Sequence, residues 1–166
     1  MLIAIISDIH DNIVNLEKCL EWCRKNQVEK IICCGDVTNS ETISYLAANF
    51  SGEIFLVAGN MELYEENILT RYRNIKYSGE VGLKKIGGLN IGFCHQPEKI
   101  KKVFKLSDLA PDFIFYGHTH KPWLEQTDKT IIANPGNAAG VFQQATFAVL
   151  DTDTKKLDLK IIADLK

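Results

Sequence analysis

The chain has little of what would assign it to a membrane or to a nucleic acid. Its 166 residues carry a formal net charge of −2 at pH 7, so basic side chains are not in excess. This balance gives no electrostatic basis for binding a nucleic-acid polymer or a membrane surface. The opening apolar run stops at Ser7 and Asp8, too early for a signal sequence or a membrane span. We therefore expect a cytoplasmic protein whose partners include neither.

Proline-rich and flexible stretches are also absent. The sequence has 4 prolines and 11 glycines, and no repeat, low-complexity tract or linker interrupts it. A chain of this length buries one full core but is short for two, so we expect a single domain over residues 1–166. The 5 cysteines are odd in number and include no CxxC pair, which predicts reduced thiols. Four of them are expected in the core: Cys19, Cys23, Cys33 and Cys34.

Strands and helices are predicted to alternate in the first half of the chain. Short continuous apolar runs predict strands buried on both faces at residues 2–7, 30–35 and 52–59. Apolar side chains at helical spacing predict helices at residues 12–27, after a cap at Asp11 or Asn12, and at residues 40–50. This order argues for parallel strands joined by helical crossovers.

The second half has a different pattern. Glycines break residues 74–79, 80–88 and 89–95 into short segments, which predicts antiparallel hairpins. Residues 98–109 predict a short basic amphipathic helix, and five further strands are expected after it. Together the two halves predict a mixed α/β chain with two packed sheets and helices outside them.

Five of the predicted strands end close to a side chain that can bind metal. All 4 histidines of the chain lie at or just past such an end. Because the carboxyl ends of parallel strands gather at one edge of a sheet, we expect these side chains to converge. The seven candidates are Asp8, His10, Asp36, Asn60, His95, His118 and His120. The alternative, ordinary turn or core histidines, would have to apply four times and would leave the three other residues unexplained.

The ligand types indicate which ions and which chemistry to expect. Oxygen donors combined with imidazoles suit borderline divalent ions better than Ca²⁺ or Mg²⁺. We expect Mn²⁺, with Ni²⁺, Zn²⁺, Fe²⁺ or Co²⁺ as alternatives. Seven ligands are too many for one tetrahedral zinc but suit two ions that share a carboxylate. Such a pair would keep a net positive charge, attract a phosphate group and activate water for attack on phosphorus.

The motifs Asp8-Ile9-His10, Gly35-Asp36, Gly59-Asn60, His95 and Gly117-His118-Thr119-His120 together resemble those of the calcineurin-like metallophosphoesterase superfamily. The chain is most similar to the short, single-domain bacterial and archaeal phosphodiesterases, which also match SDIHDNIVNLE and the NPGN at residues 134–137. The resemblance implies a four-layer α-β-β-α sandwich of two mixed sheets flanked by helices. It also implies hydrolysis of small phosphodiesters by a hydroxide that bridges two metal ions.

The resemblance further assigns ligands to each ion. It implies one ion held by Asp8, His10, Asp36 and His120. It implies a second held by Asp36, as the bridge, with Asn60, His95 and His118. The implied catalytic part of Asp36, Asn60 and His95 is to position metal and phosphate. We expect a small phosphate-ester substrate and, as a possibility, a homo-oligomer.

Two departures from the family pattern leave alternatives open. Met61 stands where many members have a histidine that can protonate the leaving group, so Asp11 or Glu62 would have to supply the proton, or the leaving group must be a good one. Pro97 stands where this branch commonly has a second histidine after His95. The alternatives are a phosphomonoesterase and a catalytically weak protein-interaction scaffold, the latter because a retromer subunit shares the fold.

Overall fold

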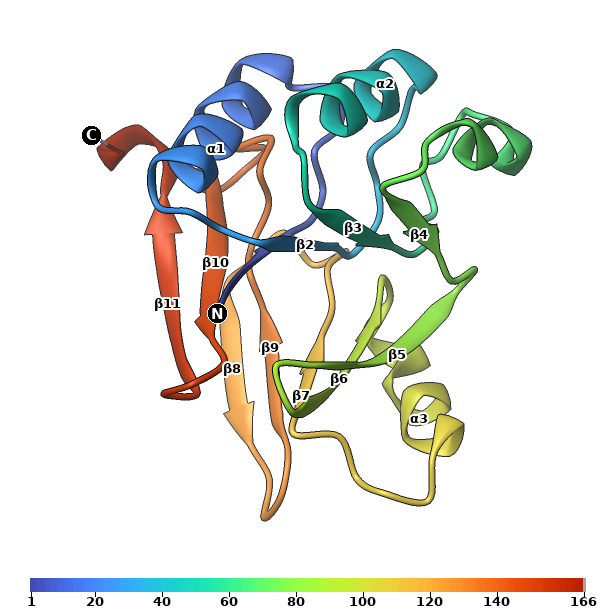
Figure 1. The fold of residues 1–166 in the computed structure, drawn as a ribbon, viewed down its shortest axis with the longest axis vertical. Helices are drawn as coiled ribbons and strands as arrows, with labels where there is room; N and C mark the ends of the chain where they lie inside the picture. The colour runs from blue at the N-terminus through green and yellow to red at the C-terminus, as the bar shows by residue number, and fades with distance from the viewer. Residues whose placement is uncertain (166) are drawn as a thin grey trace.

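The computed structural model describes residues 1–165, in which the strands form two mixed sheets (Figure 1). The six-stranded sheet has the order β11-β10-β1-β2-β3-β4, and its first four strands along the chain are parallel. Its strands are β1 (Leu2–Ile6), β2 (Lys30–Cys33), β3 (Glu53–Leu56), β4 (Ile75–Tyr77), β10 (Thr146–Asp151) and β11 (Lys156–Ile161). β10 runs antiparallel to both β1 and β11.

The five-stranded sheet has the order β5-β6-β7-β9-β8. Its strands are β5 (Val81–Ile86), β6 (Leu89–Cys94), β7 (Phe113–Phe115), β8 (Trp123–Gln126) and β9 (Ile131–Asn134). β6, β7 and β9 are parallel, while β5 and β8 are antiparallel edge strands. The parallel centre of each sheet sends several strand ends toward the same edge.

Alternating side chains explain the layers. Along β1, Ala4 and Ile6 point to one face of the sheet. There they pack with the buried side chains of two helices, α1 (Ile13–Lys25) and α2 (Ser40–Asn49). Ile3 and Ile5 point to the opposite face and pack against Phe93 and Phe115 of the second sheet. The outer face of that sheet packs against α3 (Ile100–Val103), which lies beside β5 and β6 in Figure 1. The four-layer α-β-β-α sandwich implied by the motifs is thereby confirmed.

The start of α1 follows directly from the sequence. Asn12 is the N-cap, because its side chain accepts a hydrogen bond of 3.1 Å from the backbone N–H of Asn15. The helix then buries one stripe of side chains at helical spacing: Leu16, Cys19, Leu20 and Cys23. All 5 cysteines are free and buried, as reduced core thiols would be.

Two predicted elements differ from the structure. β4 was expected in an antiparallel hairpin, but it pairs parallel with β3 at the edge of the first sheet. The connection between them contains the 3₁₀ helix η1 (Glu66–Arg71) and is long enough for a crossover, which the short pattern at residues 74–79 could not reveal. The basic helix predicted at residues 98–109 is one α-helical turn between η2 (Pro97–Lys99) and η3 (Phe104–Leu106).

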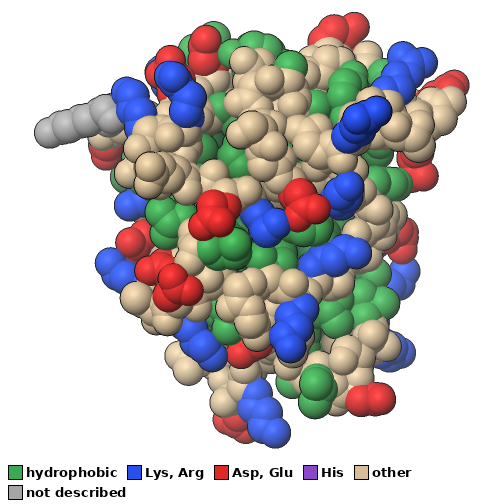
Figure 2. Space-filling model, viewed as in Figure 1, with side chains coloured by type: hydrophobic (Ala, Val, Ile, Leu, Met, Phe, Trp, Pro, Cys, Tyr) green, Lys and Arg blue, Asp and Glu red, His purple; other side chains and the backbone are tan. Residues whose placement is uncertain are grey.

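The face shown in Figure 2 mixes Lys and Arg with Asp and Glu, with no large area of one sign and no visible histidine. None of the helices within residues 1–165 combines the length and the apolar character needed to cross a bilayer.

Candidate metal centre

All seven predicted ligands lie in loops that follow parallel strands. Two contacts there join the two sheets, and a third joins two loops of the five-stranded sheet. The backbone N–H of His118 donates to both carboxylate oxygens of Asp8, at 3.2 and 3.1 Å. His95 Nδ1 lies 2.8 Å from the carbonyl oxygen of Cys34. The backbone N–H of Gly117 donates to the carbonyl of His95 at 2.9 Å. The loops of both sheets therefore converge on one site.

The first group of ligands consists of Asp8, His10 and His120. Their ligand atoms all lie within 4.8 Å of one another. The Nε2 atoms of the two histidines are 3.1 Å apart, and His120 Nε2 is 3.2 Å from Asp8 Oδ1. Donors that share one ion through bonds of about 2.0–2.2 Å lie roughly 3–3.5 Å apart. The spacing of this group therefore fits a divalent ion.

The second group is centred on Asn60. Its side-chain oxygen Oδ1 lies 2.8 Å from His95 Nε2 and 2.8 Å from His118 Nδ1. His95 Nε2 is also 3.3 Å from Asp36 Oδ2. The Asn60 oxygen thus lies beside two ring nitrogens, and an Asp36 oxygen lies beside one of them. Amide, carboxylate and imidazole donors together are typical of sites for borderline divalent ions.

Asp36 lies between the two groups. Its Oδ2 is 3.3 Å from His95 Nε2 and 3.8 Å from His10 Nε2. Its Oδ1 accepts a hydrogen bond of 2.8 Å from the backbone N–H of Met61, which fixes the carboxylate plane. Asp8 also borders both groups, since its carboxylate lies close to Asp36 and His95 as well as to His10 and His120.

The electrostatics of the site also fit a cation. Asp8 is fully buried and Asp36 is 2% exposed, and within residues 1–165 their ion-pair partners are histidines and not Lys or Arg. Burial raises the pKa of the Asp8 carboxyl above its ordinary value. Burial also acts to raise the pKa of Asp36, but the hydrogen bond and charge of His95 lower it overall. Buried carboxylates of this kind are normally neutralised by a partner or by a metal.

For the pKa of His95, burial and the neighbouring charges act in the directions opposite to those for Asp36. Desolvation acts to lower its pKa, but the hydrogen bond to Asp36 and the charges of Asp36 and Asp8 raise it above the ordinary value. A proton on this ring would partly offset the two carboxylates. A divalent ion would do so more completely, and it would use the ring nitrogen as a ligand.

Several ligands have an unusual backbone conformation. Five of the seven have positive φ: Asp8 (54°), His10 (42°), Asp36 (54°), His118 (69°) and His120 (57°). Residues other than glycine rarely adopt this region, and each such residue costs of order 1–3 kcal/mol. The surrounding contacts must hold these loops in this conformation, so the site is preorganised.

Two glycines leave room for the carboxylates. A Cβ at Gly59 would lie 2.0 Å from Asp36 Oδ1, and one at Gly117 would lie 1.9 Å from Ser7 Oγ and 2.6 Å from Asp8 Oδ2. Any side chain at either position would displace a predicted ligand. The glycines in the G-N and G-H-x-H motifs therefore have a packing reason.

The two acids considered as proton donors have other partners. Asp11 Oδ1 accepts hydrogen bonds from the backbone N–H of Asn39 and the hydroxyl of Thr42, and its Oδ2 accepts from the Asn39 side chain. Glu62 accepts three backbone N–H groups. These contacts favour structural roles, and a catalytic role for Asp11 stays a prediction.

Sequence reasoning missed what Asn134 and Asn137 do. The Asn134 side chain donates to the carbonyl of Gly117 at 2.8 Å, and the Asn137 side chain donates to the carbonyl of His120 at 3.0 Å. Both asparagines are buried and hold the loop that carries His118 and His120. Two amides on either side of Pro-Gly were the available signal, since such residues commonly bind nearby backbone.

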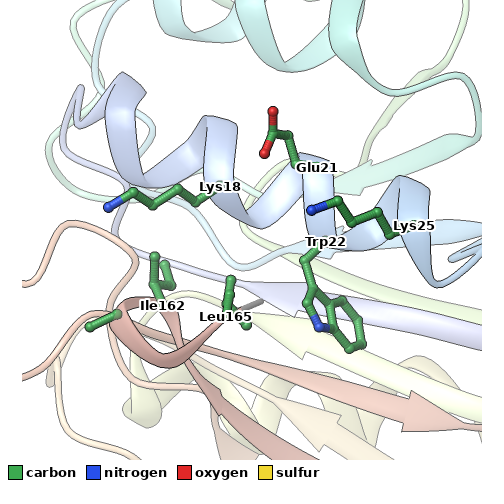
Figure 3. Close-up of a pocket in the computed structure, with 7 residues that line it drawn as sticks. Lys18, Glu21, Trp22, Lys25, Ile162 and Leu165 are labelled. Atoms are coloured by element: carbon green, nitrogen blue, oxygen red, sulfur yellow. The ribbon is translucent and has the colours of Figure 1, made fainter.

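A separate pocket lies between α1 and η4 (Ile162–Asp164), as Figure 3 shows. It is lined by Lys18, Glu21, Trp22, Lys25, Ile162, Ala163 and Leu165. None of the seven predicted ligands lines it.

Comparisons with known proteins identify the family of the chain. The model of the calcineurin-like phosphoesterase superfamily domain matches residues 1–155. A phosphodiesterase of Methanocaldococcus jannaschii is 27% identical over 169 residues, covering 94% of this chain and 96% of that protein. A solved structure of an archaeal phosphodiesterase superposes with a TM-score of 0.86 at 26% identity, covering 97% of this chain and 99% of that one. The vacuolar protein sorting-associated protein 29 of Schizosaccharomyces pombe is 23% identical, covering 100% of this chain and 86% of that protein.

Proposed function

Because the chain belongs to the calcineurin-like phosphoesterase superfamily, we propose that this metal-dependent phosphoesterase hydrolyses small phosphodiesters with two divalent ions. The observation that carries the two-ion proposal is the position of Asp36 Oδ2, which faces His95 at 3.3 Å and His10 at 3.8 Å. One carboxylate oxygen can therefore serve two neighbouring ions. The phosphodiesterase activity named for the archaeal relatives supports the choice of diesters over monoesters.

Each ion would have its own set of ligands. Asp8, His10, Asp36 and His120 would hold one, and Asp36, Asn60, His95 and His118 would hold the other. Two ions bound there would supply Lewis acidity, which lowers the pKa of water and stabilises charge on phosphoryl oxygens. We propose Mn²⁺ as the native ion, with Ni²⁺, Zn²⁺, Fe²⁺ and Co²⁺ as alternatives that suit the same donors.

The side chains divide into a buried base and an exposed rim. Asp8, Asp36 and His95 are buried and fix the base of the site. Asn60 and His118 are exposed, so the substrate would approach from their side. Met61, 50% exposed beside Asn60, has no proton to give a leaving group. This favours esters whose leaving group departs without a general acid.

A direct assay tests the proposal. Purified protein with excess Mn²⁺ should cleave bis(4-nitrophenyl) phosphate, and the Asp36→Ala variant should lose that activity. A rate no higher than that of Asp36→Ala would contradict the proposal. Faster cleavage of 4-nitrophenyl phosphate by the same preparation would favour a phosphomonoesterase instead.

The second candidate function is that of a protein-interaction scaffold. The similarity to the vacuolar protein sorting-associated protein supports it, as do Met61 and Pro97, which leave few polar groups near the site. Rapid turnover with stoichiometric metal would count against it. We also propose that residues 1–166 form one metallophosphoesterase domain. This domain would be located in the cytoplasm and would be able to form a homo-oligomer.

A further inference from the structure

We propose that Glu62 is a positioning residue of the metal centre. Its carboxylate ties the loop that carries Asp36 to the loop that carries Asn60, and through this it sets the affinity for metal. The effect on metal affinity rests on the proposed function. The tie itself is a property of the folded chain.

The contacts of Glu62 join two segments that are distant in sequence. Glu62 Oε2 accepts the backbone N–H of Thr38 at 2.9 Å. Glu62 Oε1 accepts the N–H of Gly59 at 3.0 Å and that of Val37 at 3.4 Å. Oε2 accepts from one residue of the Asp36 loop, and Oε1 accepts from another residue of that loop and from the residue just before Asn60. The carboxylate is therefore shared between the two ligand loops.

This junction depends on a side chain, unlike the neighbouring one. The loop carrying Asp8 and His10 joins the Asp36 loop through backbone bonds, since Asp8 N–H donates to Gly35 and both Ile9 and His10 N–H donate to Asp36. Between the Asp36 and Asn60 loops, the main chain contributes the bond from Leu63 N–H to the carbonyl of Thr38. The backbone N–H of Met61 also donates to the Asp36 side chain, and Glu62 accepts three further hydrogen bonds at this junction.

The conformation of Thr38 shows why a connection is needed. Its φ is 87°, in a region that a β-branched residue rarely adopts. Its N–H and its carbonyl are bound by Glu62 and Leu63, so both ends of this residue are fixed from the Asn60 loop. Releasing the N–H would free Thr38 to relax, and Asp36 lies two residues before it.

Asp11 provides a comparison on the other side of the same loop. Its oxygens accept from Asn39 N–H, the Asn39 side chain and Thr42. In Asp11→Asn, the side-chain amide of Asn39 can rotate and restore its bond with the new amide. Three hydrogen bonds to Glu62 come from backbone N–H groups, which cannot reverse their polarity. Glu62→Gln therefore places an NH₂ group against an N–H, whereas Asp11→Asn is repaired locally.

The test compares Glu62→Gln with Glu65→Gln, in protein of full length. Glu65 is exposed and hydrogen-bonds only Asn67 through its carboxylate among the described contacts, so its substitution makes the same charge change without touching the ligand loops. Two measurements are needed: amide proton shifts and hydrogen exchange of Thr38 and Gly59 in metal-free protein by NMR, and Mn²⁺ affinity by calorimetry.

We expect Glu62→Gln to move the Thr38 or Gly59 amide proton upfield, to speed its exchange, and to weaken Mn²⁺ binding roughly 10-fold or more. Glu65→Gln should stay within about 3-fold of the wild-type affinity. Unchanged amides in Glu62→Gln, or altered amides with unchanged Mn²⁺ affinity, would overturn the positioning role. Altered amides together with no Mn²⁺ binding by wild-type protein would support the tie and overturn the metal-dependent function instead.

Discussion

The backbone N–H of Met61 donates a hydrogen bond of 2.8 Å to Asp36 Oδ1. The residue that lacks a proton donor in its side chain thus still fixes the carboxylate that faces both ligand groups. Because the contact uses the backbone, the Met61 side chain can be replaced without breaking it. The ligand geometry and the supply of a proton are therefore separable at this position.

The first prediction uses that separation. Met61→His should accelerate cleavage of diesters with poor leaving groups by roughly 10-fold or more, since general acid catalysis contributes about 10²–10⁴-fold when well placed. Substrates with 4-nitrophenolate as the leaving group should gain much less. The measurement is kcat across a series of aryl leaving groups. Met61→Gln, which adds polarity without a titratable proton, is the control, and an equal gain in both variants would contradict the explanation.

The second prediction concerns metal removal. Mn²⁺ should raise the melting temperature of chelator-treated protein, because an ion that binds only the folded state at about 100 times its Kd adds about 2.7 kcal/mol to stability. Asp36→Asn should abolish the shift, since Asp36 faces both ligand groups. Differential scanning calorimetry measures it. Asp153→Asn is the control, because this carboxylate is exposed and is not a predicted ligand. That variant should keep the full shift in melting temperature.

The third prediction concerns the glycine before Asn60. Gly59→Ala would put a Cβ 2.0 Å from Asp36 Oδ1, so Asp36 must move and Mn²⁺ affinity should fall by at least roughly 10-fold. Gly79→Ala is the matched control, because its Cβ would meet nothing within 4 Å. That control should cost about 1–2 kcal/mol in stability through its positive φ and leave metal affinity unchanged. Equal affinities for the two variants would refute the packing role of Gly59.

The fourth prediction concerns the thiols. All 5 cysteines are buried, and burial raises the pKa of Cys94 to about 12 and that of Cys34 above its ordinary value. Since the thiolate is the reactive form, a raised pKa leaves little of it at about pH 8. Ellman's reagent should therefore react slowly with native protein and rapidly with all 5 thiols in guanidinium. A fast phase in the native protein would show an accessible thiol.

Local sequence patterns were sufficient to predict much of the fold and to propose a set of candidate ligands. Apolar runs of strand length ended next to Asp8, Asp36, Asn60 and His95. Helical spacing with a cap at Asp11 or Asn12 predicted α1, and the structure has Asn12 as the cap. These features depend on neighbouring residues and on the rule that parallel strand ends share an edge. β4 was misassigned because its three residues, Ile75–Tyr77, carry no record of which strand they pair with.

What the sequence by itself determined was which residues are candidate metal ligands and at which strand ends they lie. Only the tertiary structure decided that Asp36 faces His10 and His95 together, and that Glu62 accepts backbone N–H groups from residues 37, 38 and 59. The reason is physical: periodicity encodes the face on which a side chain lies. The partner of a carboxylate in a loop is set by how separate loops pack, and no local pattern records that.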